Sequence, residues 1–540
     1  MDVCSSSTRS LMEIVMTKYL LSRIVRGLIS IIIVVLIVML LIYSCLNKDM
    51  IFAQDPTYTK MKSNAREIYK YRQWERYGYL DLVEYSDYLQ ELLDAGEIDQ
   101  TTYSEAVLLG IDAGAAYPEY DKYVQQFTEK YESEGYKIEK MKADRAGSKI
   151  KDGGNPQLFA QKPIPLAKRA WTYFTGIFTF DNIHKVKEDV GERGLSFTFF
   201  DPAYGGEKFS PAIMGNGTQH KYLLYFDSQF PYVHQNFVRI NLGASYTVNK
   251  GIDVFNTMTD SQGAFKTQMI TYPAGLTEES ADNLHTAVYA EGSFTDSSSA
   301  IIKDRFVDNY TNVSTYKSGF SKVGYSFIIG IISVIMAYVI ALPLGMLMAR
   351  KKDKLIDNLG TIYIVFIIAV PSLAYIFLFK AIGGKFGLPT TFDMTAPTWT
   401  MYILPIISLA LPSIANLMKW LRRYMIDQMN SDYVKFARSG GLSEGEIFRK
   451  HILKNAAIPI VHGIPGSVLG SLVGAIITER VYVVPGAGNL LTNAINAYDN
   501  GVIVGVTLFY ALLSVVSIML GDILMSLVDP RISFSTKKGR

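Results

Sequence analysis

Long apolar runs near both ends of the chain flank a polar stretch, and this pattern predicts membrane spans. A helix needs about 20 mostly apolar residues to cross the hydrocarbon core of a bilayer. The first run, residues 27–46, contains no charge and is longer than the apolar core of a signal peptide, so we interpret it as a retained anchor. Later runs predict five further spans, at residues 325–348, 359–379, 401–417, 456–477 and 502–527.

Basic residues set the expected orientation, because short cytoplasmic loops carry an excess of Lys and Arg. They cluster before the first span, between the second and third, between the fourth and fifth, and at the C-terminus: Lys18, Arg23, Arg26, Arg350, Lys351, Lys352, Lys354, Arg422, Arg423, Lys435, Arg438, Arg449, Lys450, Lys454, Arg531, Lys537, Lys538 and Arg540. Six spans with both termini in the cytoplasm bring every cluster to the cytoplasmic side. Residues 51–319 are then extracellular.

The polar stretch 51–319 predicts a folded α+β domain. Residues 55–145 are expected to be helical, because apolar residues recur at helical spacing in 82–95 and 120–141. Residues 160–315 are expected to be mixed and strand-rich. Their β-branched and aromatic segments are 195–200, 221–226 and 237–242. The segment 142–161, rich in glycine and charge, is expected to link the two parts.

Composition narrows the class of protein. The net charge of +3 is small and dispersed, so nucleic acid is not an expected partner. Cys4 and Cys45 both lie near the first span, and the polar stretch has no cysteine, which suits a bacterial surface domain held by its own core. The six histidines show no metal-ligand spacing, and no catalytic constellation stands out. We therefore expect no metal-binding or catalytic residue.

The segment 420–455 is too polar to cross a membrane and too regularly patterned for a simple linker. Ser431 or Asp432 can cap a short helix, which Gly440-Gly441 can end in a left-handed turn. A second helix begins at Ser443, where Glu446 completes a capping box, and it continues amphipathically into the fifth span. We predict a helix, a glycine turn and a helix on the cytoplasmic face.

This segment resembles the coupling loop of oligopeptide/dipeptide-type ABC importer permeases. The resemblance rests on DYVKFARSGGLSE at 432–444 and RKHILKNAAIP at 449–459. The wider importer pattern is Glu-Ala-Ala, three residues, then Gly; Ala437 and Gly441 match it, whereas Lys435 and Phe436 do not match its start. His451 to Asn455 replace a later Ile-x-Leu-Pro. These departures resemble the variant of the peptide subfamily.

Other segments are similar to the same family. They are residues 474–488, which end in Pro485-Gly486-Ala487-Gly488, residues 527–532 and, more faintly, residues 241–246. The clear similarity covers about residues 320–535 and the first span. It implies a mainly α fold, a six-helix type I ABC importer transmembrane domain with a large α+β insertion between the first and second spans. Its parts are residues 1–50 with the cytoplasmic N-terminus and first helix, 51–319, and a five-helix core at 320–540.

The resemblance also implies the partners. A second homologous permease would complete the translocation pathway, two ATP-binding subunits would drive it, and a lipid-anchored or soluble peptide-binding protein would deliver substrate from outside. The sequence has no Gly-x-x-x-x-Gly-Lys-[Ser/Thr] loop for cradling phosphates. We therefore expect no cofactor on this chain, no ATPase activity of its own, and ATP and Mg on the partner subunits. The expected location is the bacterial cell membrane.

Two sets of candidate site residues follow. The expected ATPase-coupling residues are Asp432, Tyr433, Phe436, Ala437, Arg438, Gly441, Leu442, Ser443, His451 and Asn455. The candidates for a gate or pathway are Glu479, Pro485, Gly486, Gly488 and Asp522. Acidic residues in or near membrane spans suggest function by default, but helix-packing ion pairs stay open as the alternative for Glu479 and Asp522.

Two other function classes compete with an importer permease. A membrane receptor or mechanotransmission protein would work through the polar domain, but such proteins typically have fewer spans and lack the glycine-turn loop. An ion-coupled carrier would need charges near the middle of its spans, where few occur. For the polar domain itself, a docking or stabilising cap and direct substrate capture both stay open. The sequence does not distinguish peptides from nickel, glutathione or other substrates of relatives.

Overall fold

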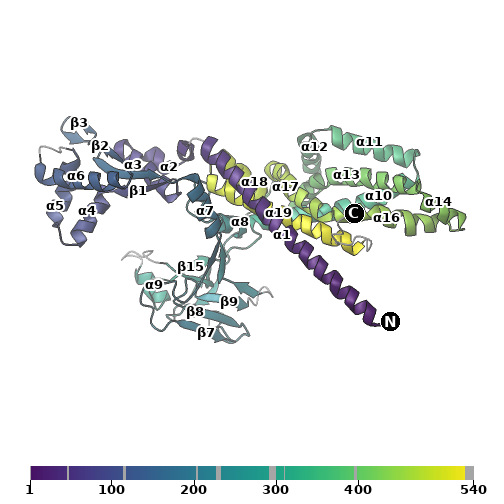
Figure 1. Cartoon of the computed structure of the whole chain (residues 1–540), viewed down its shortest axis with the longest axis horizontal. Coiled ribbons are helices and arrows are strands. Elements are labelled where there is room, and N and C mark those ends of the chain that lie inside the picture. The colour runs from purple at the N-terminus through teal and green to yellow at the C-terminus, as the bar shows by residue number, and fades with distance from the viewer. Residues whose placement is uncertain are drawn as a thin grey trace.

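The chain folds into a helical membrane domain and a two-lobed insertion at one end of it (Figure 1). The computed structural model describes residues 2–45, 48–112, 117–201, 203, 205–226, 233–290, 299–308, 311–394 and 398–528. Of the similar segment 527–532, residues 529–532 lie outside this description, as does the basic C-terminus. In the insertion, residues 48–163 form the helical lobe and residues 178–315 form the strand-rich lobe.

Five helices of the described chain are long and apolar enough to cross a membrane. The spans are Leu21–Tyr43 within α1 (Asp2–Cys45), Lys322–Arg350 (α10), Trp399–Met429 with α13 (Ile403–Met429), Ile464–Tyr482 (α17) and Asn500–Met525 within α19 (Asn500–Val528). A mainly helical membrane domain with an α+β region after the first span is thus confirmed. Its buried core includes Ile329, Ala337, Tyr375, Ala410 and Met418.

The predicted span 359–379 is wrong as a single helix. It is a pair, α11 (Leu355–Ala369) and α12 (Ser372–Lys385), bent by 109° at the break between them. Val370 adopts an extended backbone before Pro371, because the proline ring disfavours helical geometry in the preceding residue. If the pair counts as one span, the membrane domain has up to six.

The predicted fifth span, 456–477, also has the wrong bounds. Helix α16 (Lys454–His462) ends at Gly463, and the spanning helix α17 begins there, with Pro465 in its first turn. Proline is favoured in a first turn, where its missing N–H has no intrahelical acceptor to lose. A short helix α18 (Ala487–Asn496) then connects α17 to α19.

The helical lobe packs its helices around a three-stranded antiparallel sheet of order β1-β5-β2. Its elements are η1 (Lys48–Phe52), α2 (Pro56–Lys60), α3 (Ser63–Arg76), β1 (Leu80–Glu84), α4 (Tyr85–Asp94), α5 (Gln100–Glu105), η2 (Ala106–Gly110), α6 (Pro118–Ser133), β2 (Lys137–Met141), β3 (Arg145–Ala146), β4 (Lys149–Ile150) and β5 (Gln157–Pro163). Tyr85, Leu89, Phe127, Leu158 and Ala160 lie in its core.

Two expectations for this lobe need correction. The first residues of the predicted helix 82–95 belong to β1, and the last residues of 120–141 form β2, since Gly135 (φ 82°) turns the chain after α6. The proposed linker 142–161 contains most of β5, the central strand of the sheet. The connection between the lobes is instead formed by α7 (Leu166–Gly176), as Figure 1 shows.

The strand-rich lobe contains a four-stranded antiparallel sheet of order β10-β9-β8-β7 and several two-stranded ribbons. Its elements are β6 (Phe178–Phe180), β7 (Gly194–Thr198), β8 (Ala212–Asn216), β9 (Tyr222–Phe226), β10 (Val233–Gln235), β11 (Val238–Ile240), α8 (Val254–Thr259), β12 (Gln268–Thr271), β13 (Thr277–Ser280), β14 (Asp282–Tyr289), α9 (Ser299–Arg305) and β15 (Thr311–Thr315). The three strands predicted near 195, 221 and 237 correspond to β7, β9 and β11.

A buried carboxylate joins the insertion to the membrane domain. Asp499, which directly precedes α19, accepts hydrogen bonds from the Ser245 hydroxyl (2.6 Å) and from the backbone N–H groups of Tyr246, Thr247 and Val248 (2.9 Å each). The Tyr246 ring also stacks on Tyr77 of the helical lobe, with ring centroids 4.0 Å apart. The segment 241–246, which faintly resembles importer permeases, therefore lies at the joint.

Candidate functional site

The loop after α13 folds as its caps and glycines predict. Helix α14 (Asp432–Ser439) is followed by α15 (Glu444–Glu446) and the π-helical turn η6 (Ile447–Leu453), which leads into α16. Ser443 and Glu446 form the reciprocal capping box. Gly441 has a φ of 83° and open space around it, so the left-handed backbone conformation, rather than close packing, favours glycine there.

Helix α14 has one face toward the protein and one toward the surroundings. Val434 and Ala437 are buried against α13 and η6, in a cluster with Met425 and Ile447. Phe436 points away from this cluster and is 80% exposed. A large aromatic side chain on a short helix that is held by its other face is typical of a protein-binding surface.

The remaining coupling candidates lie on α14, on the glycine turn and on the helical segment that follows it. Tyr433 and Leu442 are each 37% exposed, and Arg438 forms an ion pair with Glu444 across the glycine turn. Asp432 is exposed and pairs with Lys435. His451 and Asn455 are half-buried in η6 and α16, and the His451 ring centroid lies 6.5 Å from that of Tyr433. The structure thus brings the predicted residues together, with Ala437 in the interior.

Glu479 is fully buried near the end of α17, where it holds the turn that leads into α18. Its carboxylate accepts hydrogen bonds from the Ser326 hydroxyl (2.5 Å) and from the Asn489 backbone N–H (3.0 Å). A Cβ on Gly486 would lie 2.3 Å from the Glu479 carboxylate, and one on Gly488 would lie 2.6 Å from Ile476. The Pro485–Gly488 turn therefore needs its glycines because it wraps closely around this side chain.

Asp522 lies on α19 and contacts side chains of two other helices. Its carboxylate is 3.2 Å from the Arg23 guanidinium of α1 and 3.7 Å from the His462 ring of α16. Asp522 and Glu479 thus each connect neighbouring helices, and a role of either in a gate stays a prediction.

A cavity of about 520 Å³ lies between α10, α12, α13, α16 and α17. Its wall combines hydroxyl and amide groups with aromatic rings, and the described lining residues include no charged side chain. The polar and aromatic members are Tyr338, Ser372, Tyr375, Ser408, Ser413, Asn416, Trp420, Tyr424, Ser467, Ser471 and Thr478. None of the sequence-predicted gate residues is among them. The small polar residues within apolar spans were the signal that would have indicated this wall.

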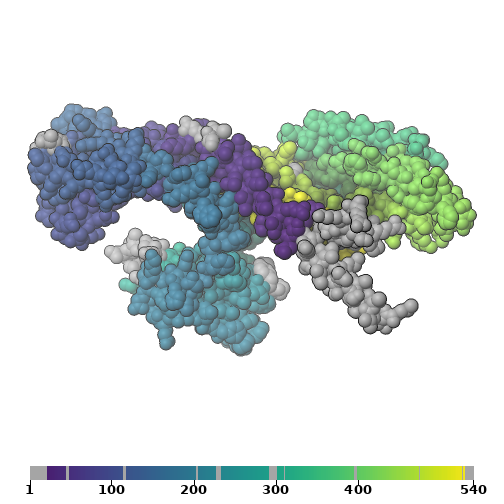
Figure 2. All heavy atoms as spheres, viewed as in Figure 1, coloured from purple at the N-terminus to yellow at the C-terminus, as the bar shows by residue number. Residues whose placement is uncertain are grey.

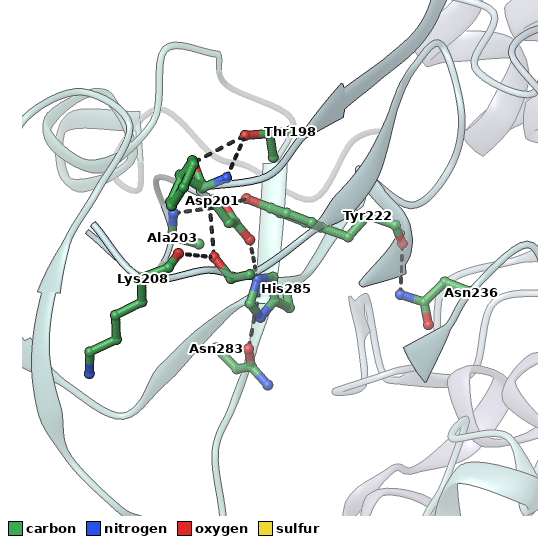
Figure 3. Close-up of polar contacts among 10 residues, drawn as sticks. Thr198, Asp201, Ala203, Lys208, Tyr222, Asn236, Asn283 and His285 are labelled. Atoms are coloured by element: carbon green, nitrogen blue, oxygen red, sulfur yellow. Dashed lines mark hydrogen bonds and ion pairs between the residues drawn. The ribbon is translucent and has the colours of Figure 1, made fainter. Parts of the chain in front are cut away.

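The insertion has its own buried polar centre, in the strand-rich lobe (Figure 3). Asp201 and His285 are both buried, with 2.5 Å between Oδ2 and Nε2. Asp201 also accepts hydrogen bonds from the Tyr222 hydroxyl (3.1 Å) and the Ala203 N–H (2.9 Å). Among the described residues there is no group of three or more possible metal ligands. The contacts connect β14, β9 and a loop, as a structural cross-link would.

Comparison with known proteins identifies the family. A family model described as "Binding-protein-dependent transport system inner membrane component" matches residues 341–534. The oligopeptide transport system permease protein AmiC of Streptococcus pneumoniae serotype 4 is 35% identical over 531 residues, which are 97% of this chain and 100% of AmiC. The chain belongs to this family of transport permeases. It is a permease subunit of an ABC transporter and not itself an ATPase.

A second relative matches a much smaller part of this chain than AmiC does. The dipeptide transport system permease protein DppB of Lactococcus lactis subsp. cremoris is 33% identical over 229 residues, which are 41% of this chain and 73% of DppB. The alignment with AmiC is long enough to include most of the insertion. The resemblance noted in the sequence is confirmed, and it extends beyond the residues that carried it.

Proposed function

We propose that this permease forms half of the translocation pathway of an ATP-driven oligopeptide importer, and that Phe436 transmits the movement of the ATPases. The oligopeptide substrate is carried over from AmiC, which is similar over nearly the whole chain. The observation that carries the coupling role is the 80% exposure of Phe436 on a helix whose opposite face is buried. A rigidly held helix can pass a displacement to the spans that it packs against.

The partners follow from this role. Two ATP-binding subunits hold ATP and Mg and contact the surface formed by Tyr433, Phe436 and Leu442. A second homologous permease closes the cavity wall, and a peptide-binding protein, lipid-anchored or soluble, delivers the substrate. The hydroxyl and amide groups of the wall suit hydrogen bonding to peptide amides during passage.

The force follows a continuous packed route. Val434 and Ala437 of α14 contact a cluster that includes Leu421 and Met425 of α13, and α13 also forms a wall of the cavity. Helix α16 continues from the same loop and contributes to that wall as well. Closure of the ATPases would move α14, and with it the two elements that line one side of the pathway. This is alternating access driven from the cytoplasm.

The same proposal fixes the topology. Residues 1–20 and the loop at 420–455 face the cytoplasm, the insertion at 51–319 is extracellular, and the protein spans a bacterial cell membrane. The basic residues Arg422, Arg438 and Lys450 then lie on the cytoplasmic side, as the positive-inside rule requires.

The test is a substitution that changes the exposed face and leaves the buried one intact. Phe436→Asp should leave the permease inserted and assembled with the second permease, but lower peptide uptake at least about tenfold, because a hot-spot aromatic contributes 2 kcal/mol or more. Uptake and ATP hydrolysis are measured in proteoliposomes of the complex. Gly441→Trp should act in the same direction, since a side chain is strained at a φ of 83°.

A matched control is available at Phe386, the residue after α12, which is 82% exposed and lies outside the loop. Phe386→Asp makes the same chemical change at the same exposure and should retain uptake close to the unsubstituted protein. Normal coupled uptake by Phe436→Asp would refute the proposed role of α14.

A further inference from the structure

A second groove of the membrane domain lies apart from the cavity and is not used by the proposed transport mechanism. It has a volume of about 570 Å³ and runs between α1, α17, α18 and α19. Apolar side chains such as Ile31, Val34, Ile476 and Ile518 line most of it, and two guanidinium groups, those of Arg23 and Arg26, line one end.

The groove exists because α1 packs tightly on α19 along one face only. At Gly27 the helices nearly touch, and a Cβ there would lie 2.5 Å from Val515 Cγ1. Only 17% of the spanning window of α1 is buried, so most of this helix faces away from the protein. Figure 2 shows α1, in purple, on the outside of the membrane domain. The rim of the groove is therefore open to the surroundings of this chain.

The charged end of the groove has an unbalanced positive charge. Arg23 is paired with Asp522, at 3.2 Å. Arg26 is exposed and donates a hydrogen bond to the Ser22 hydroxyl (2.8 Å), a neutral partner that does not offset its charge. An arginine at the end of a spanning helix is costly unless its head reaches the interface or meets an anion.

We propose that this groove binds an anionic phospholipid, with an acyl chain along the apolar wall and the headgroup phosphate on Arg26. The chemistry matches at both ends, since guanidinium groups bind phosphate with two parallel hydrogen bonds and basic pockets between membrane helices bind anionic headgroups. Bound lipid would fasten α1, the helix that leads into the insertion, to α19. The site does not depend on which substrate is transported.

The test uses the intact complex in nanodiscs of phosphatidylcholine with about 20 mol% phosphatidylglycerol. The phosphatidylglycerol supplies the anionic headgroup to which basic residues are attracted. The complex is then extracted into mild detergent, and the retained lipid is counted by native mass spectrometry. Phosphatidylglycerol should be retained over phosphatidylcholine. Arg26→Gln should lower its retention about fivefold, the factor for one basic residue at an anionic surface.

Two further variants distinguish the contribution of the lipid headgroup from that of the acyl chain. Lys351→Gln removes an exposed basic residue from the link after α10, outside the groove, and should retain lipid like the unsubstituted protein. Ala511→Phe narrows the apolar wall and should lower retention of both lipids while Arg26 is intact. Equal loss in Arg26→Gln and Lys351→Gln, or no preference for phosphatidylglycerol, would overturn the proposal. Disulfide cross-linking of Ala511→Cys to a helix of the second permease would overturn it as well.

Discussion

Val434 and Phe436 are two residues apart on α14, yet their environments are opposite. Val434 is fully buried among side chains of α13 and η6, whereas Phe436 has almost no neighbour within the chain. We therefore expect Val434 to contribute to the stability of the membrane domain and Phe436 to contribute to the binding of another subunit. Ala437, which matches the importer pattern, belongs by its burial to the packed face, and its part in coupling stays a prediction.

This division predicts separable effects of truncation. Val434→Ala removes two buried methyl groups and should destabilise the membrane domain by about 1–2 kcal/mol, lowering its Tm. Phe436→Ala should leave the Tm of the isolated permease unchanged within about 0.5 kcal/mol, because little of its surface is buried. Thermal unfolding in detergent, followed by binding of the purified ATPases, measures both. Equal Tm losses in the two variants would contradict the assignment of the faces.

At the scale of elements, the turn from α17 into α18 is built around a single carboxylate. Glu479 connects α17 to Ser326 of α10 and to the backbone of α18 at Asn489. Because the Pro485–Gly488 turn closes on this group, its two glycines are set by space rather than by backbone angle. The turn is thereby fixed to α10, which also lines the cavity.

Adding one methyl group should disturb this turn. Gly486→Ala places a Cβ 2.3 Å from the Glu479 carboxylate, so either the turn or the hydrogen-bonded carboxylate must shift, at a cost of about 1–3 kcal/mol. Gly466→Ala in α17 meets no atom within 4 Å and should be neutral or slightly stabilising, by about 1 kcal/mol at most. The Tm of each purified variant checks this. Identical Tm values for the two would show that the turn is not closely packed.

Local signals explain which elements could be predicted. Ser443, Glu446 and Gly441 act through their own backbone, so the helix–turn–helix of the loop could be deduced from the sequence alone. Strand β5 could not, because its place is set by distant partners, β1 and β2. The bend at Pro371 could not be predicted from the proline alone. Pro412 lies inside the unbroken helix α13, whereas Pro371 separates α11 from α12, so a proline within an apolar run is compatible with either structure.

The cavity shows the same limit at the candidate site. Ser408 and Ser413 come from α13, whereas Ser467 comes from α17. Small polar residues within the spans mark the individual positions, but their convergence on one cavity depends on how the helices pack and cannot be deduced from one segment. The gate candidates lie outside the lining of this cavity, and their role as a gate stays a prediction.

At the scale of the whole molecule, the insertion and the membrane domain meet at Asp499. This carboxylate stands at the start of α19 and collects the backbone N–H groups of residues 246–248, so the loop and the helix are held as one unit. A movement of α19 would be passed to the insertion through this joint. The insertion is thus placed to respond to the state of the membrane domain.

Asp499→Ala should loosen the joint. It leaves four backbone N–H groups, those of residues 246–248 and of Val502, without this acceptor, at about 1–3 kcal/mol for each one that stays buried. Hydrogen exchange at residues 245–248 should accelerate at least about tenfold, while exchange in the helical lobe far from the joint is unchanged. Asp152→Ala, an exposed carboxylate of the insertion, is the control and should change nothing at the joint. Unaltered exchange in Asp499→Ala would mean that contacts other than those of Asp499 hold the insertion to the membrane domain.

The proposed topology places the α14 surface and the insertion on opposite sides of the membrane, with α14 in the cytoplasm. Single cysteines at Ser439 and Asp152, in a chain whose Cys4 and Cys45 are replaced by serine and alanine, test it through labelling of intact cells with a membrane-impermeant maleimide. This topology predicts that Asp152→Cys is labelled at once and Ser439→Cys only after permeabilisation. Labelling of Ser439→Cys in intact cells would contradict it.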